Sequence, residues 1–118
     1  MKIEITAVSG NKGNIKIWNF HSGELLNKIK IINDTFPENK EIYGLCLWNN
    51  EYIFVGCNDK NIKLIEINKG KVIKKLTGHE NTVSTIKKVV HPKYGQCLIS
   101  SGNDNKIKIW ININLIKN

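Results

Sequence analysis

NIKIW at 14–18, NIKLI at 61–65 and KIKIW at 106–110 are three versions of one short segment. Their last positions, 18, 65 and 110, are 47 and 45 residues apart. Each version follows a turn-like stretch rich in Asn, Asp, Lys or Gly, at 11–13, 58–60 and 103–105. A constant period of this length, with one turn and one strand-like segment in every copy, indicates a repeat architecture.

Composition limits the class of protein. The chain has 118 residues, the size of one domain, and 41% of them are hydrophobic, which suffices for a core. It has no run of 18 apolar residues, and residues 1–10 lack the apolar centre of a signal peptide. We therefore expect an intracellular, cytoplasmic protein. Cys46, Cys57 and Cys97 lack the paired spacing of a zinc site and are expected to be buried free thiols.

The net charge of +8 suggests an anionic partner at first sight. All 18 basic residues are lysine, however, and lysine lacks the planar fork with which arginine grips phosphate or guanine. Ile, Lys and Asn have AT-rich codons and together make up 55 residues, so a base bias of the genome explains this composition. The lysines are also spread along the whole chain. We therefore expect neither a nucleic acid nor a membrane as partner.

Alternation of apolar and polar residues dominates the chain, and no segment keeps a helical period. In 106–113, Ile107, Ile109, Ile111 and Ile113 fall on one face, opposite Lys106, Lys108, Trp110 and Asn112. The pattern predicts strands at 2–8, 14–20, 24–31, 41–48, 51–57, 61–67, 71–76, 82–90, 96–101 and 106–112. Tight turns between short strands indicate an all-β protein of antiparallel sheets.

Three motifs of the last copy resemble a WD repeat. Gly78-His79 matches the Gly-His pair that opens such a repeat, LISSGND at 98–104 matches its second strand and turn, and 106–110 matches its third strand. In the family a Trp-Asp pair closes that strand, whereas here Ile111 follows Trp110 and Asn19 follows Trp18. The resemblance extends over the whole chain and is strongest in 78–113.

The resemblance implies a β-propeller, whose blades are four-stranded antiparallel sheets. The chain would form a single WD-repeat region with a partial blade at 1–31, a full blade at 41–77 and a nearly full blade at 78–113. This amounts to about 2.7 blades, an incomplete and open propeller, against the four to eight of a closed ring. An open stack leaves an apolar face bare at each end. We therefore expect a fragment of a longer propeller, or closure with blades of another chain.

His79, Ser100 and Asp104 have the residue types of a hydrolase triad. The resemblance implies instead that His79, Ser100, Asp104 and Trp110 form a buried structural network. No Gly-x-Ser-x-Gly turn surrounds Ser100, which favours the structural reading. The matching positions hold Val55, Asp59 and Ile65 in the middle copy, and Val8, Lys12 and Trp18 in the first. His21 and His91 are isolated, and we expect no catalytic, cofactor or metal site.

By resemblance the chain acts as a non-enzymatic scaffold or adaptor that binds other proteins. Partners of such propellers dock on the face formed by the turns between second and third strands and the turns that open each repeat. The residues at matching positions are Glu41, Tyr43, Asn58, Thr82, Ser84 and Asn103. Tyr43 is the strongest candidate, because aromatic side chains dominate binding hot spots. The alternative is a lysine-rich surface that binds a polyanion, either RNA or an acidic phospholipid head group.

Overall fold

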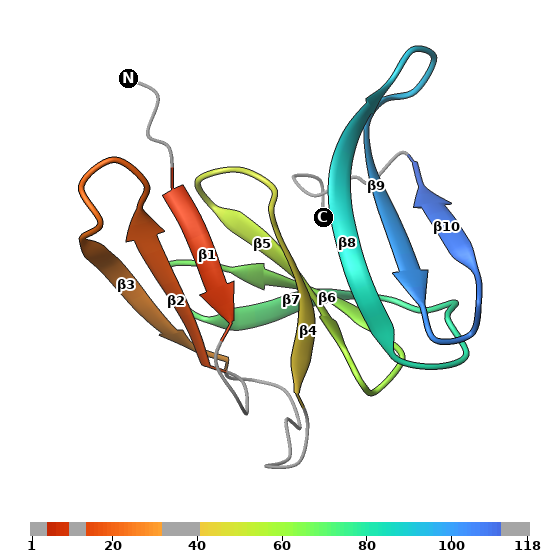
Figure 1. Ribbon diagram of the computed structural model, residues 1–118, viewed down its shortest axis with the longest axis horizontal. Coiled ribbons are helices and arrows are strands. Elements are labelled where there is room, and N and C mark those ends of the chain that lie inside the picture. Colours follow the sequence, from red (N-terminus) through yellow and green to blue (C-terminus); the bar gives the residue numbers. More distant parts are fainter. Residues whose placement is uncertain (1–4, 10–13, 32–40, 112–118) are drawn as a thin grey trace.

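The computed structural model describes the backbone of residues 5–9, 14–31 and 41–111, and the side chains of 14–31 and 41–111. The described residues form ten strands and no helix (Figure 1). None of the described segments is a helix of the length and hydrophobicity that a membrane crossing requires. The strands are β1 (Ile5–Ser9), β2 (Asn14–Asn19), β3 (Leu25–Lys30), β4 (Ile42–Leu47), β5 (Tyr52–Cys57), β6 (Ile62–Glu66), β7 (Lys71–Leu76), β8 (Val83–His91), β9 (Gly95–Gly102) and β10 (Ile107–Trp110).

The strands form three antiparallel sheets, each made of strands consecutive in sequence. The first sheet is β1-β2-β3, the second is β4-β5-β6-β7 and the third is β8-β9-β10. The sheets stand beside one another like the wedges of a fan, and their first strands, β1, β4 and β8, lie closest together (Figure 1). The predicted all-β fold, an incomplete β-propeller, is confirmed. Residues 2–4 of the strand predicted at 2–8 lie outside the described part of the chain.

Short polar side chains close the turns between strands. The Asn19 carboxamide oxygen accepts the backbone N–H groups of His21 and Ser22, and Asn49 Oδ1 accepts those of Glu51 and Tyr52. These are Asx turns, in which a side-chain oxygen accepts backbone N–H groups that follow it in the turn. The Asn and Asp residues that interrupt the apolar alternation are therefore the residues that set the strand boundaries.

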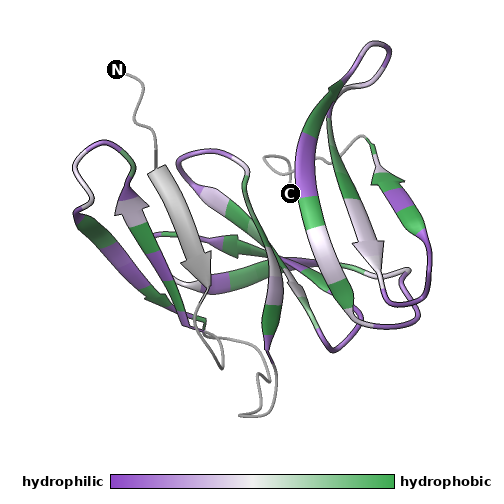
Figure 2. Cartoon of the chain, viewed as in Figure 1, coloured by the Kyte–Doolittle hydropathy of each residue, from purple (hydrophilic) through white to green (hydrophobic). Residues whose placement is uncertain are grey.

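The second sheet is buried on both faces, whereas the outer sheets are buried on one face each. Hydrophobic residues occur along β5 and β6 (Figure 2). Successive residues of these strands point alternately into two separate cores. Ile53, Val55 and Ile65 pack toward the first sheet, while Phe54 and Leu64 pack toward the third. Consequently Ile62, Lys63, Leu64 and Ile65 are all buried in succession on β6. Such a continuous run is the pattern of a strand enclosed from both sides.

Two glycines let the second and third sheets approach closely. A Cβ on Gly44 would lie 2.7 Å from Ile86 Cγ1, and a Cβ on Gly56 would lie 2.8 Å from Val83 Cγ1. The absence of a side chain at these positions brings β4 and β5 against the start of β8. The beginnings of β4 and β8 therefore lie side by side.

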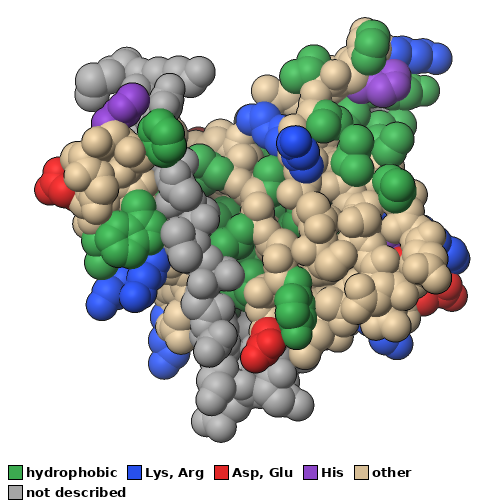
Figure 3. Space-filling model, in the orientation of Figure 1, with side chains coloured by type: hydrophobic (Ala, Val, Ile, Leu, Met, Phe, Trp, Pro, Cys, Tyr) green, Lys and Arg blue, Asp and Glu red, His purple; other side chains and the backbone are tan. Residues whose placement is uncertain are grey.

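The free face of the third sheet is apolar. Ile107, Ile109 and Ile111 are 75%, 57% and 39% exposed, and the register aligns Ile109 with Ile99 and Lys87 on the same face. The alternation predicted for this strand is confirmed from Ile107 to Ile111, while Asn112 and Ile113 lie outside the described residues. Hydrophobic side chains also gather over the β8–β9 hairpin, where Val90 is 76% exposed (Figure 3).

Candidate functional site

Four side chains at one end of the third sheet form a chain of hydrogen bonds. The Trp110 indole N–H donates to Ser100 Oγ at 2.8 Å, and Ser100 Oγ lies 2.7 Å from His79 Nε2. His79 Nδ1 lies 2.9 Å and 3.1 Å from the two oxygens of Asp104. When the serine hydroxyl donates to Nε2 and the Nδ1–H donates to Asp104, every group is satisfied with a neutral imidazole. The structure thus brings together all four residues singled out in the sequence.

The elements that carry these residues explain the arrangement. Ser100 lies on β9, Trp110 on β10, Asp104 in the turn between them and His79 in the connection from β7 to β8. Asn105, in the same turn, has a φ of 64°. Asn tolerates this left-handed conformation better than most residues, which allows the tight reversal. The network therefore ties the β7–β8 connection to the β9–β10 turn.

The carboxylate of Asp104 is held in its ionised form. The Glu80 backbone N–H donates to Asp104 Oδ2 at 2.9 Å, and this bond is the main cause that lowers the pKa of Asp104 to about 2. The bonds from His79 and from the Lys106 backbone N–H act in the same direction, against the opposing effect of burial. Hydrogen bonds that favour the charged form depress the pKa of a carboxyl group. Asp104 is therefore the anionic anchor of the turn.

The geometry of the network differs from that of a working hydrolase. Ser100 is 1% exposed, and its Oγ is shared between Trp110 and His79. A nucleophile must reach a substrate carbonyl with an oxyanion site about 3 Å away. Burial of Ser100 beneath Trp110 supports the structural interpretation of these residues.

The middle copy has an apolar contact where the last copy has the polar network, and the sequence reasoning missed only the ion pair beside this contact. Val55 and Ile65 are both fully buried and belong to one apolar core, so both polar partners are replaced together. Asp59, in the turn that matches Asp104, forms an ion pair with Lys63. Lys63 is 0% exposed, although it lies in the alternating Ile/Lys segment whose lysines were expected opposite the buried isoleucines. The spacing of four residues between Asp59 and Lys63 is the signal that would have indicated this pair.

In the first copy the comparison is incomplete. Trp18 is half-buried on β2, while the side chains of Val8 and Lys12 lie outside the described part of the structure.

The first group of predicted partner-binding residues gathers at the start of β4. The Tyr43 hydroxyl donates to Glu41 Oε2 at 3.0 Å, and this bond raises the pKa of the Tyr43 phenol. The Glu41 backbone N–H donates to Asn58 Oδ1 at 3.3 Å. Tyr43 is 53% exposed, so its ring is held in place by Glu41 while one side faces solvent.

The second group gathers at the matching place in the third sheet. The Asn103 backbone N–H donates to the Thr82 carbonyl oxygen at 2.9 Å, and the Ser84 hydroxyl donates to the Ser101 carbonyl oxygen at 3.3 Å. Because β4 and β8 start side by side, both groups lie at the same end of adjacent sheets (Figure 1). The structure thus places all six predicted residues at one end of the molecule, in two neighbouring groups.

The remaining histidines and cysteines are separated. His21 is exposed, and His91 Nδ1 accepts the backbone N–H of Lys93 at 3.0 Å. Across residues 14–31 and 41–111, no group of three or more His, Cys, Asp or Glu side chains has the arrangement of a metal site. The three cysteines are free thiols, of which Cys57 and Cys97 are fully buried, and burial raises the pKa of the Cys46 thiol.

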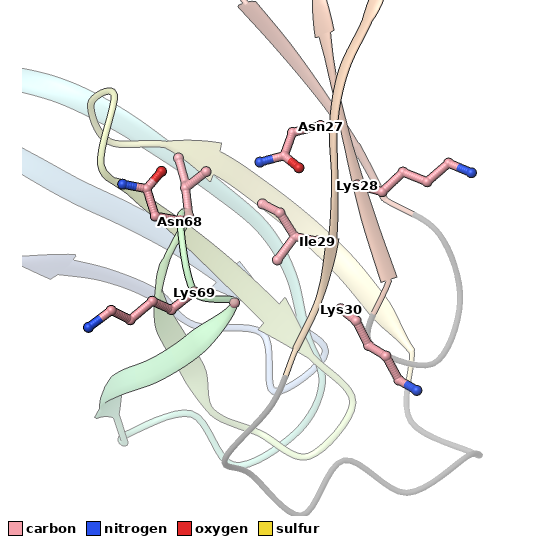
Figure 4. Close-up of a pocket in the computed structure, with 8 residues that line it drawn as sticks. Asn27, Lys28, Ile29, Lys30, Asn68 and Lys69 are labelled. Atoms are coloured by element: carbon pink, nitrogen blue, oxygen red, sulfur yellow. The ribbon is translucent and has the colours of Figure 1, made fainter.

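A small cavity of about 120 Å³ lies between the first sheet and the β6–β7 turn (Figure 4). Ile29 points toward the second sheet, whereas Lys28 and Lys30 point away from it. Gly70 allows the β6–β7 turn to approach β3 closely, because a Cβ there would clash with the Lys30 carbonyl oxygen. The cavity is a gap between packed sheets, and its lysine side chains diverge from it.

Comparison with known proteins matches this geometry. Residues 70–110 match the family model WD40, described as "WD domain, G-beta repeat". The nuclear distribution protein nudF of Aspergillus niger is 42% identical over 62 residues, which cover 52% of this chain and 13% of that protein. Guanine nucleotide-binding protein subunit beta-5b of Danio rerio is 41% identical over 58 residues, which cover 49% of this chain and 14% of that protein.

The fold has matches among solved structures as well. The structure of U3-55K superposes with a TM-score of 0.65 at 19% identity, over 95% of this chain and 37% of that one. By contrast, the segments of nudF and of subunit beta-5b that match this chain make up only about an eighth of the length of those proteins. The motifs of the last copy, the fan of antiparallel sheets and the matched family model agree, and they support the predicted resemblance to WD repeats, which the family model matches over residues 70–110.

Proposed function

We propose that this chain is part of a protein-binding scaffold, in which the end of the fan carrying Tyr43 docks a partner protein. In this proposal residues 1–31, 41–77 and 78–113 are successive blades, the first partial and the last nearly complete. The observation that carries the proposal is Tyr43, an aromatic side chain that is 53% exposed and is fixed by a hydrogen bond to Glu41. An ordered, half-exposed aromatic ring loses little conformational entropy on binding, which is a property of interface hot spots.

The surroundings of Tyr43 support the proposal. Asn58 lies beside it, and Thr82, Ser84 and Asn103 form the adjacent group on the next sheet. Small polar side chains around an aromatic anchor supply hydrogen bonds at the rim of an interface. One of the relatives is named as a subunit of a guanine nucleotide-binding protein, which agrees with a role in assembly.

The exposed face of the third sheet supports packing of a further blade, from the same longer protein or from another chain. Ile107 and Ile109 are exposed side by side with Ile111 on that face. Stacked repeats bury such faces against their neighbours.

Tyr43→Ala, with Tyr94→Ala as a matched control, tests the docking end. Tyr94 is 42% exposed and lies in the β8–β9 hairpin. Affinity capture from extract of the source organism, quantified for both variants and the unchanged chain, should show proteins that are lost with Tyr43→Ala and kept with Tyr94→Ala. Equal recovery with all three would refute the assignment of this end. Recovery of nucleic acid or lipid in place of protein, with a steep loss at raised salt, would favour the polyanion alternative.

A further inference from the structure

The free face of the first sheet carries three lysines close together. Lys16 lies opposite Lys28 across β2 and β3, and Lys30 lies opposite Asn14. All three lysines are exposed, and in the part of the chain that the structure describes none of them forms an ion pair. Opposite residues of antiparallel strands have Cβ atoms about 5 Å apart, and like charges there are destabilising. This cluster, Lys16, Lys28 and Lys30, is here named the lysine face.

The lysine face borders a cavity. Its volume is about 380 Å³, and its lining residues are Asn14, Ile15, Lys16, Lys28, Ile29 and Lys30. Among the residues that the structure describes, the lining contains three ammonium groups and no carboxylate. A concave surface of this composition is electrostatically complementary to an acidic group.

The second sheet shows what happens to a lysine at this position when a neighbour packs on it. Lys16 pairs with Val8 and Lys28 in the first sheet, just as Lys63 pairs with Val55 and Lys75 in the second. Lys63 is fully buried at the contact with the first sheet, and its charge is met by the carboxylate of Asp59. A buried charge without a partner is strongly unfavourable, so this carboxylate is a condition for the packing.

The first copy lacks the corresponding carboxylate in its own sequence. The turn position that holds Asp59 in the second copy and Asp104 in the third holds Lys12 in the first. Anything that covers the lysine face must therefore bring negative charge with it.

We propose that the lysine face docks an acidic surface of another protein, whose carboxylates take the place beside Lys16 that Asp59 takes beside Lys63. The proposal rests on the scaffold role argued above but uses a different surface from the one around Tyr43. A second copy of this chain fits poorly, since the free face of the third sheet presents Ile107, Ile109 and Lys87 and, among the described residues, no carboxylate. A protein is favoured over a nucleic acid, because Leu25 is 41% exposed beside Trp18 on the same face and the chain has no arginine.

Fluorescence anisotropy with a labelled peptide of about ten residues, long enough for one extended strand, tests the proposal. The peptide alternates Glu and Thr, and the comparison probes are the same peptide with Gln for Glu and a single-stranded oligonucleotide of equal charge. The combined variant Lys16→Gln, Lys28→Gln, Lys30→Gln should weaken binding of the acidic peptide about tenfold, as expected for three exposed ion pairs of two- to threefold each. The matched control Lys71→Gln, Lys74→Gln, Lys87→Gln removes three exposed lysines elsewhere and should weaken it less than about twofold.

Equal losses in the two combined variants would overturn the proposal, since they would show a general attraction to net charge. Oligonucleotide binding tighter than peptide binding and lost with the lysine face would overturn it in favour of nucleic acid. A light-scattering mass that falls from dimer to monomer when the three lysines are replaced would overturn it in favour of a second copy. If the combined variant does not fold, Lys28→Gln alone is used in the same assay, because it removes the pair of like charges formed by Lys16 and Lys28. Tyr43→Ala should leave peptide binding unchanged. A failure of the proposal for the lysine face is therefore distinguishable from a failure of the proposal for the docking end at Tyr43.

Discussion

Replacement of Ser100 by Ala tests the hydrogen-bonded network at the end of the third sheet. The change removes one oxygen that bonds both the Trp110 indole N–H and His79 Nε2. Trp110 is half-buried, so its N–H can be rehydrated, whereas the His79 side chain is 1% exposed and cannot. The expected cost is that of one unsatisfied buried polar group, about 1–3 kcal/mol in the free energy of unfolding.

Urea and thermal denaturation followed by circular dichroism measure this cost. In a chain of this length, 1 kcal/mol corresponds to roughly 4 °C in Tm, so Ser100→Ala should lower Tm by about 4–12 °C. Ser101→Ala is the matched control, because Ser101 is the next residue of β9 and its side chain lies on the opposite face. Its Tm should change by less than about 2 °C, as is usual for surface substitutions.

A second variant separates the Trp110–Ser100 hydrogen bond from the loss at His79. Trp110→Phe removes the indole donor, so the cost of Ser100→Ala should be smaller in that background, with a coupling of about 0.5–1 kcal/mol. His79→Ala should destabilise as much as Ser100→Ala, because it also breaks the chain of bonds. If Ser100→Ala and His79→Ala both leave Tm unchanged, the network contributes nothing to stability and the structural reading of these residues is wrong.

Three further predictions concern other parts of the fold. The pKa of Asp104 is lowered from 3.8 to about 2, so its contribution to stability is complete above pH 4 and is lost as the pH falls toward 2. The difference in unfolding free energy between the unchanged chain and Asp104→Asn, measured by urea titration across this range, should therefore shrink with falling pH. A constant difference would contradict this assignment. Lys63→Met leaves the Asp59 carboxylate without its buried ion pair and should cost about 3 kcal/mol, while Lys63→Met with Asp59→Asn should cost less; equal losses in urea denaturation would argue against the pair. Gly56→Ala places a Cβ 2.8 Å from Val83 Cγ1 and should cost about 1–3 kcal/mol, and Val83→Ala in the same chain should recover part of the loss, a rescue that separates the clash from a change in backbone entropy.

The strands were predictable because their local signals and their packing agree. Asn19 and Asn49 end strands through side-chain bonds to the following backbone, which depends only on neighbouring residues. The alternation of Ile107 and Ile109 with Lys108 needs no knowledge of the rest of the fold. The network of His79, Ser100, Asp104 and Trp110 was found because the motif fixes their spacing, and the four side chains do come together.

The charged residues were less predictable, because their environment depends on which sheet lies next to them. Lys16 and Lys63 occupy matching positions in nearly identical segments, yet Lys16 is exposed and Lys63 is buried. The difference comes from tertiary packing, since the second sheet has a neighbour on both faces and the first sheet on one. In the sequence this difference is visible only at the matching turn position, which holds Asp59 in the second copy and Lys12 in the first.

The two free faces of the fan therefore call for different neighbours. The face with Ile107 and Ile109 gains free energy when apolar surface covers it, at roughly 25 cal/mol for each Å² buried. The face with Lys16 and Lys28 gains only if the covering surface supplies carboxylates, because the ammonium groups would otherwise lose their hydration without compensation. Stacking a copy of the third sheet on the first would bring Lys87 toward those lysines, with no described carboxylate between them. A partner for the first sheet is consequently selected by charge, and a partner for the third sheet by apolar contact. The chemistry of the two faces thus determines which kind of neighbour packs on each.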